Sequence, residues 1–180
     1  MISRFFQDPG QSFFLFGPLG TGKSTWLKQA VPQALYLDLL DPQQFREFSA
    51  HPEKLLAMVE AGVPSGIVVI DEIQKIPQLL DVAHLLIEEN SPIQFILTGS
   101  SARKLKRSGV DLLAGRAAYK TLHPFMGAEL GEDFKLALAL KQGLVPLVTQ
   151  STNPRETLEA FIALYVREEV QAESLVRNVG

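Results

Sequence analysis

The chain has 180 residues, of which 46% are hydrophobic and 21% are charged, a composition that suffices for one folded domain with a hydrophobic core. Its formal net charge of −3 gives no overall positive field that would attract nucleic acid or an anionic membrane surface. The absence of cysteine excludes disulfide bonds, thiolate zinc sites and cysteine nucleophiles.

The first ten residues, MISRFFQDPG, contain neither the long apolar core nor the small-residue cleavage site of a signal peptide. No apolar run in the sequence approaches the roughly 18 residues of a membrane-spanning helix. We therefore expect a cytoplasmic protein without a membrane partner.

The first predicted strand, residues 13–16, runs into the glycine-rich stretch GPLGTGKST, residues 17–25. This stretch fits the pattern G-x-x-x-x-G-K-[ST], with Gly17, Gly22, Lys23 and Ser24 at the fixed positions. Residues 25–30 then form a short predicted helix before Pro32. A strand, a glycine-rich loop and a helix in this order indicate a phosphate loop, here residues 17–24. The alternative is a hairpin turn followed by an exposed lysine.

In a phosphate loop, backbone N–H groups around Gly20 would surround the phosphates at the start of a helix, whose dipole favours anions. Lys23 would reach the β- and γ-phosphates, Ser24 would give its hydroxyl to Mg²⁺, and Thr25 would support the α-phosphate or cap the turn. The expected cofactors are ATP and Mg²⁺. The predicted nucleotide-binding residues are Gly17, Pro18, Leu19, Gly20, Thr21, Gly22, Lys23, Ser24 and Thr25.

Short apolar segments alternate with helical patterns along the next hundred residues. The predicted strands are residues 13–16, 34–39, 67–70, 94–97 and 117–122, and the predicted helices between them are residues 43–49, 52–61, 77–89 and 101–113. The third and fourth strands, IVVI and the FILT run, are continuously apolar, as strands buried on both faces should be. The alternation predicts an α/β fold with a parallel sheet covered on both faces.

The third strand lies in the segment GIVVIDEIQ, residues 66–74, and ends in two acids. Asp71 stands where a phosphate-loop fold needs a second magnesium contact, which we expect to pass through a bound water. Glu72 lies where the chain turns away from the strand, so its carboxylate could orient and deprotonate an attacking water. The alternative is that both acids merely begin a solvated loop.

The fourth strand ends in hydroxyl groups, in the segment FILTGSS, residues 95–101. If this strand lies between the first and the third, Thr98 or Ser100 would come near the γ-phosphate and sense it. Either residue could instead be a helix cap, since Ser and Thr are favoured there.

Basic residues follow. The segment RKLKR, residues 103–107, is either a solvated helix face or a small nucleic-acid contact. Arg116 is a candidate cation for transition-state charge, supplied in cis or by a neighbouring subunit, or else an ion pair at the sheet edge. The histidines His51, His84 and His123 are scattered and indicate no metal cluster.

A second region begins near Pro124. We predict a helix over residues 132–142, closed by Gly143, and another that begins after Asn153, with Pro154 first and Glu156 completing a capping box. The expected division is a P-loop ATPase domain at residues 1–123 and a helical extension at residues 124–180, which either packs on the first region or begins a truncated C-terminal domain.

Four segments in this order, GPLGTGKST, VVIDEIQKIP, ILTGSSARKL and LAGRAAYKTLHPFMGAEL, resemble the prokaryotic AAA-like P-loop ATPases over roughly residues 1–170. In that family the ATPase core precedes a C-terminal domain likened to restriction-type nucleases. The resemblance implies a three-layer P-loop NTPase sandwich with sheet order 5-1-4-3-2. It also implies phosphate-loop, magnesium and catalytic-acid roles for Lys23, Ser24, Asp71 and Glu72, and a sensor in the GSS stretch.

The chain departs from the family pattern at Leu19, where many members have arginine, and at Met126, where many have serine. Members are also substantially longer, so we expect most of the C-terminal domain to be absent here, the chain being either a fragment or a short relative. Neither substituted residue belongs to the predicted catalytic chemistry.

The sequence thus predicts a Mg²⁺-dependent ATPase that couples hydrolysis to a conformational change. The alternative is a nucleotide-gated binding module with little turnover, acting on DNA, on a protein partner or through self-association. A GTPase is disfavoured because no Asn-Lys-x-Asp segment for guanine occurs, and a small-molecule kinase because no arginine-rich lid is present.

Overall fold

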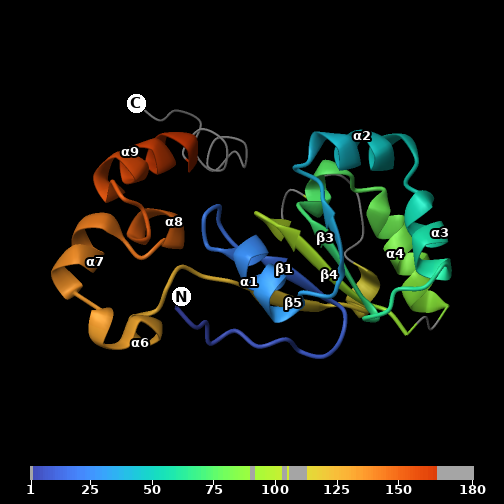
Figure 1. Cartoon of the computed structure of the whole chain (residues 1–180), viewed down its shortest axis with the longest axis horizontal. Helices are drawn as coiled ribbons and strands as arrows, with labels where there is room; N and C mark the ends of the chain where they lie inside the picture. The colour runs from blue at the N-terminus through green and yellow to red at the C-terminus, as the bar shows by residue number, and fades with distance from the viewer. Residues whose placement is uncertain (1, 90–91, 103–104, 106–112, 166–180) are drawn as a thin grey trace. The chain divides into compact units, whose positions relative to one another are not determined.

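A computed structural model of the chain describes residues 2–89, 92–102, 105 and 113–165 (Figure 1). It divides into two compact units. The sheet unit comprises Asp8–Gly17 and Lys23–Thr121, and the helical unit comprises, among the described residues, 2–7, Pro18–Gly22 and 122–165.

The sheet unit is an α/β layer structure. Its elements in chain order are β1 (Phe13–Phe16), α1 (Lys23–Ala30), β2 (Leu35–Asp38), α2 (Pro42–Ala50), α3 (Lys54–Glu60), β3 (Ile67–Asp71), the 3₁₀ turn η1 (Ile73–Lys75), α4 (Leu79–Glu88), β4 (Gln94–Gly99), η2 (Leu113–Gly115) and β5 (Ala118–Thr121). The expected strands all form, within one or two residues of their predicted ends. Most of the helix expected at residues 101–113 lies outside the described residues.

The five strands are parallel in the order β2-β3-β4-β1-β5, which confirms the expected fold class and the order 5-1-4-3-2 read from the opposite edge. Strand β4 therefore lies between β1 and β3, as the sensor prediction requires. Because all strands run in one direction, their carboxyl ends share one edge of the sheet.

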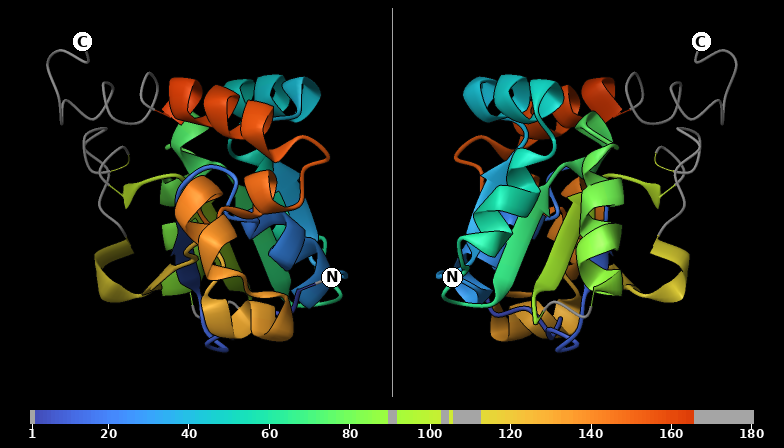
Figure 2. Two further views of the ribbon diagram at one scale, coloured as in Figure 1. Left: turned by 90° about the vertical axis from the view of Figure 1, so that its left-hand side faces the viewer. Right: turned by 90° about the vertical axis from the view of Figure 1, so that its right-hand side faces the viewer.

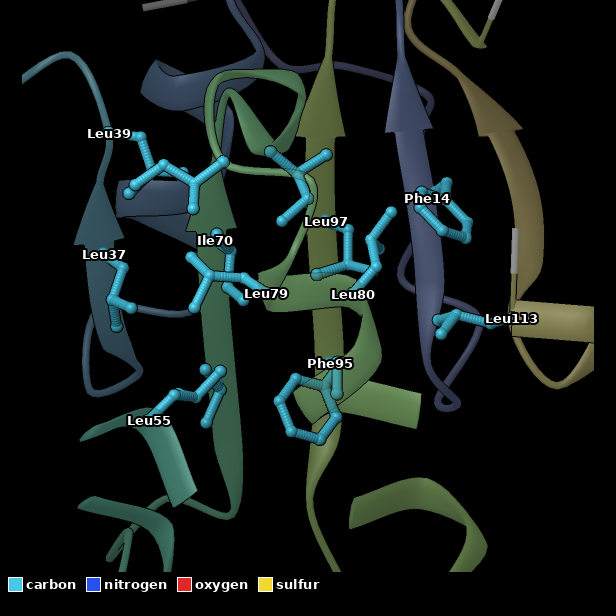
Figure 3. Close-up of a cluster of buried hydrophobic side chains, with 14 of the residues drawn as sticks. Phe14, Leu37, Leu39, Leu55, Ile70, Leu79, Leu80, Phe95, Leu97 and Leu113 are labelled. Atoms are coloured by element: carbon cyan, nitrogen blue, oxygen red, sulfur yellow. The ribbon is translucent and has the colours of Figure 1, made fainter. Parts of the chain in front are cut away.

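Both faces of the sheet are covered. Alternate residues of β1 point to opposite sides, so Phe14 and Phe16 enter the core under α2, α3 and α4, while Phe13 and Leu15 are buried on the other side. Figure 3 shows this core, and the right-hand view of Figure 2 looks onto the face that α3 and α4 cover. In Figure 1, α1 lies on the opposite side of the sheet, where its Leu27 is fully buried.

Local capping explains where some helices begin. The Asp41 carboxylate accepts hydrogen bonds from the backbone N–H groups of Gln43 and Gln44, at 2.7 and 3.3 Å, and Pro42 occupies the first position of α2. Helix α4 has apolar residues at helical spacing, and its side chains that face the core are buried: Leu79, Leu80, Ala83 and Leu86.

The helical unit contains α6 (Gly127–Leu130), the 3₁₀ turn η3 (Gly131–Asp133), α7 (Leu136–Gln142), α8 (Pro146–Thr149) and α9 (Pro154–Tyr165). The helix expected from residue 132 begins only at Leu136, because Phe134 is extended. Its ring lies beside Gly127, where a methyl group would be in ordinary contact with it, 3.4 Å away. The extended backbone at Phe134 therefore delays the start of α7.

Helix α9 begins at Pro154 as expected, but the capping box is wrong in its partners. Glu156 accepts a hydrogen bond from the side-chain amide of Asn153 at 2.6 Å, while the Asn153 backbone N–H donates to Ser151 at 3.1 Å. No helix among the described residues is both long and apolar enough to cross a membrane.

Candidate functional site

The chemistry-bearing residues of the sheet unit gather at the carboxyl edge of the sheet. Register pairs Asp38 of β2 with Asp71 of β3, and Leu15 of β1 with Thr98 of β4. Since Ile70 pairs with Leu97, the next residues, Asp71 and Thr98, also stand side by side. The strands thus bring together two of the predicted site residues that lie 27 positions apart in the chain.

Asp71 is buried, with 1% of its surface exposed, and both of its carboxylate oxygens accept hydrogen bonds. Thr98 Oγ1 donates to Asp71 Oδ1, and the Tyr36 hydroxyl donates to Asp71 Oδ2 at 2.5 Å. A buried carboxylate needs such donors, because an unpaired charge in the interior is costly. These two contacts hold the Asp71 side chain in one orientation.

Tyr36 of β2 also hydrogen-bonds to Ser24, so one hydroxyl joins the two residues predicted to bind magnesium. Burial, the hydrogen bond to Asp71 and the negative charge of Asp71 raise the pKa of the Tyr36 hydroxyl far above its usual value. The hydroxyl therefore remains protonated and can donate. Lys28 covers the Tyr36 ring, with its ammonium 5.3 Å from the ring centroid.

Sequence reasoning missed Tyr36. In β2 it reads as an ordinary strand aromatic, and only the pairing of β2 with β3 brings it beside Asp71. The sole signal in the sequence is its position two residues before Asp38, at the end of a strand.

Glu72 adopts a left-handed backbone conformation, with φ 63° and ψ 47°, directly after β3. Such a conformation costs a non-glycine residue about 1–2 kcal/mol, so it needs support from its surroundings. The Glu72 N–H donates to Thr98 Oγ1 at 3.0 Å, and this bond fixes the turn. Thr98 thus orients Asp71 and Glu72 together, through one hydroxyl that donates to the first and accepts from the second.

Gln74 holds the Glu72 side chain. Its Nε2 donates to Glu72 Oε2, while its Oε1 is buried and makes no hydrogen bond within the described part of the chain. Gly99 makes room for this amide, because a Cβ at that position would lie 2.7 Å from Gln74 Oε1. Gln74 was also missed, although it stands only two residues after the acid that it contacts.

The two candidate sensor hydroxyls differ in their partners. Thr98 is fully buried and already engaged with Asp71 and Glu72. Ser100 Oγ is buried too, but it has no hydrogen-bond partner in the regions that the structure describes. A buried hydroxyl without a partner is unusual and marks a position that a ligand oxygen could satisfy.

Lys23 is the first residue of α1 and is buried, with 6% of its surface exposed. Its Nζ donates to the carbonyl oxygen of Gly17, the residue after β1, at 2.7 Å. Ser24 follows in the same helical turn, whereas Thr25 is exposed.

The phosphate-loop residues Pro18–Gly22 belong to the helical unit. Gly20 and Gly22 have φ values of 77° and 88°, in the region that favours glycine. Between them, buried Thr21 closes a turn, because its N–H and its hydroxyl both donate to the Pro18 carbonyl oxygen, at 3.4 and 2.9 Å. Leu19 is partly exposed.

Arg116 lies at the opposite end of the sheet. Phe13, the first residue of β1, pairs with Ala118, so Arg116 precedes the amino edge, which lies roughly 10 Å from the carboxyl edge at about 3.3 Å per strand residue. There its guanidinium forms an ion pair with Glu88 of α4, at 2.7 Å. This contact agrees with the expected ion pair at the sheet edge. The position gives no support to Arg116 as a transition-state cation in cis, and its action in a neighbouring subunit stays a prediction.

Other predicted features carry less information. Apart from Leu105, the RKLKR segment lies outside the described residues. Across the described ranges, no three His, Asp or Glu side chains group so as to hold a metal ion. Magnesium needs no such cage, since it is commonly held by one or two protein oxygens, water and phosphate.

Comparison with known proteins gives a family match. The family described as AAA domain matches residues 10–131, which is more than half of the chain. Two uncharacterized proteins, from Mycobacterium bovis and Mycobacterium tuberculosis, are each 29% identical over 140 residues, or 77% of this chain and 31% of theirs. The chain thus spans about a third of the length of these relatives.

Two solved structures are similar at lower identity. The replication initiator DnaA bound to AMPPCP and single-stranded DNA is 15% identical, with a TM-score of 0.47 over 92% of this chain and 59% of that chain. AMPPCP-bound DnaA from Aquifex aeolicus is 14% identical, with a TM-score of 0.40 over 89% and 57%.

Proposed function

The chain belongs to the AAA domain family of P-loop ATPases, and from this premise we propose that it binds MgATP, hydrolyses it and couples nucleotide state to a conformational change. The observation that carries the proposal is the contact set around Thr98, which orients a buried carboxylate and the residue after it at one edge of the sheet. An acid for the metal and a base for water are the two functions that hydrolysis requires there.

The residues fit magnesium. Ser24 and Asp71 both hydrogen-bond to the Tyr36 hydroxyl, so a hydroxyl and a carboxylate converge within reach of one small group. Hard oxygen donors of this kind suit Mg²⁺. Ser24 and Asp71 would hold the ion, which when bound would offset the negative charge that develops on the transferred phosphoryl group.

Phosphate binding rests on the loop and on Lys23. We assign the N–H groups of the phosphate loop to the phosphate oxygens, and the Lys23 ammonium, now on the Gly17 carbonyl, to the β- and γ-phosphates. The carbonyl contact pairs this buried cation with a dipole.

Glu72 is the proposed general base. Its left-handed backbone turns the residue out of the strand, and Gln74 fixes one carboxylate oxygen and leaves the other for a water. Ser100, buried without a partner in the described regions, is the proposed γ-phosphate sensor, while Thr98 orients the two acids.

The second candidate function is a nucleotide-gated module with little turnover, and the Gln74 contact favours it. The Gln74 amide occupies Glu72 Oε2, so the carboxylate is not fully available to an attacking water and hydrolysis would be slow until this contact breaks. DNA, a protein partner or a second copy of the chain are proposed triggers. The cytoplasmic location and the domain division at residue 124 also stay predictions.

The test is MgATP affinity by calorimetry, followed by phosphate release under saturating ATP with and without DNA. Lys23→Ala should weaken binding tenfold or more, because a hydrogen bond to a charged group contributes about 1.5–3 kcal/mol. Lys141→Ala, an exposed lysine of α7, is the matched control and should bind like the parent. Equal affinity of Lys23→Ala and the parent would contradict the nucleotide site. Binding without phosphate release would favour the gated module.

A further inference from the structure

Arg4 makes three hydrogen bonds and a ring contact within the helical unit. Its guanidinium donates to the carbonyl oxygens of Thr21 and His123, at 2.9 and 2.5 Å, and to Glu129 Oε1 at 3.1 Å. It also stacks over the Phe125 ring, 4.9 Å from the centroid. We propose that Arg4, fixed by Glu129, is a positioning residue that aims the Gly22 N–H of the phosphate loop at a bound phosphate. This inference rests on the proposed function.

The geometry of the peptide bond carries the argument. A trans peptide is planar, so the C=O of one residue and the N–H of the next point in opposite directions. The Thr21 carbonyl and the Gly22 N–H share one such peptide. Because Arg4 holds the Thr21 carbonyl, the Gly22 N–H of the same peptide must point away from Arg4, and we assign that direction to the bound phosphate.

The preceding peptide is held from outside in the same way. The Leu147 N–H, a first-turn donor of α8 with no partner in its own helix, donates to the Gly20 carbonyl at 3.2 Å. The Thr21 N–H therefore points inward, to the Pro18 carbonyl. Two successive peptides of the loop are thus oriented by residues outside it.

The glycines explain why the loop needs this support. Gly20 and Gly22 adopt positive φ, but glycine visits both signs of φ with little preference. Without an outside contact, the peptide between Thr21 and Gly22 could turn over at small cost and aim its carbonyl at the phosphates. A peptide that is free to turn over loses conformational entropy when a ligand fixes it. Because Arg4 holds the Thr21 carbonyl before the ligand binds, this loss does not weaken binding.

Glu129 makes the anchor rigid. The exposed side-chain fractions of Arg4 and Glu129 are 9% and 2%, so their ion pair is shielded from solvent. The carboxylate also accepts the backbone N–H groups of Phe5 and Met126, both at or below 2.9 Å. Burial alone would raise the pKa of Glu129, but these two N–H groups and Arg4 outweigh it and hold that pKa below its usual range.

The competing explanation is that the pair only fastens the N-terminal segment to residues 123–129. A fastening role would alter stability and leave the loop unchanged. The experiment therefore measures the loop itself, as the NMR order parameter of the Gly22 N–H, together with MgATP affinity by calorimetry and the melting temperature.

Arg4→Ala should weaken MgATP binding about tenfold, since it removes a charge-assisted contact on which the loop depends. The Gly22 order parameter should fall from about 0.85, typical of rigid backbone, to below about 0.6. Arg4→Lys keeps the charge but cannot reach three acceptors in a planar fork, so it should lose nearly as much. Arg155→Ala, which breaks the exposed Arg155–Glu159 pair, is the matched control and should change neither quantity.

Parental affinity and a parental Gly22 order parameter in Arg4→Ala would overturn the inference, as would full affinity in Arg4→Lys. If Arg4→Ala does not fold, Arg4→Lys and Glu129→Gln decide by the same two measurements. If the parent itself binds no ATP, the proposed function fails, and the Gly22 order parameter still decides whether Arg4 orients the loop.

Discussion

Replacement of Glu72 by glutamine separates catalysis from binding. The glutamine keeps the size of the side chain, and its carbonyl oxygen can still accept from Gln74 Nε2. The backbone N–H at this position still donates to Thr98, so the turn and the Asp71 orientation should persist. The substitution therefore removes the base and leaves the proposed ligand contacts intact.

The expected magnitudes follow from these contacts. A general base contributes 10²–10⁴-fold in rate, so turnover should fall by that factor, which is about 2.7–5.5 kcal/mol in the barrier. MgATP affinity should change no more than a few-fold, because Lys23, Ser24 and Asp71 are untouched. Asp71→Asn should instead weaken binding and turnover together, since it alters the metal contact.

The assay pairs calorimetric ATP affinity with steady-state phosphate release under saturating MgATP. Glu60→Gln, at an exposed position at the end of α3, is the matched control and should keep both parental values. The reasoning is refuted if Glu72→Gln hydrolyses at the parental rate, since water would then be activated elsewhere. Loss of binding in this variant would mean that Glu72 is structural, and a parent that hardly turns over would favour the gated module.

Two further substitutions test the surroundings of the site. Tyr36→Phe leaves buried Asp71 Oδ2 without its donor, which should cost about 1–3 kcal/mol and lower the melting temperature of the free protein by several degrees, at about 2–4 °C per kcal/mol. If Mg²⁺ displaces this hydroxyl from Ser24 and Asp71, the MgATP-induced rise in melting temperature should grow by a similar amount, whereas a parallel fall with and without MgATP would show that the hydroxyl stays. The Arg116→Ala variant should bind MgATP with parental affinity. If Arg116 acts in trans, the ATP turnover of the parent should rise with protein concentration, and the turnover of the variant should not. A parent rate per molecule independent of concentration would leave Arg116 only its pair with Glu88.

Local sequence patterns determined the strands, most of the described helices and the phosphate loop. The run IVVID could only be a strand buried on both faces, because its side chains are apolar at every position up to the acid. Gly20 and Gly22 could be read as a loop with positive φ, because no other residue adopts it so cheaply. These inferences need only neighbours in the chain. The sheet order was predicted by resemblance.

Tertiary structure decided which side chains support these residues. Tyr36 meets Asp71 across two paired strands, and Arg4 meets Glu129 from 125 residues away. Arg116 seemed suited to phosphate by its chemistry, but the register of β5 on β1 puts it at the amino edge. Backbone conformation depends mainly on nearby residues, whereas hydrogen-bond and ion-pair partners depend on strand register and packing, which no short segment of sequence encodes by itself.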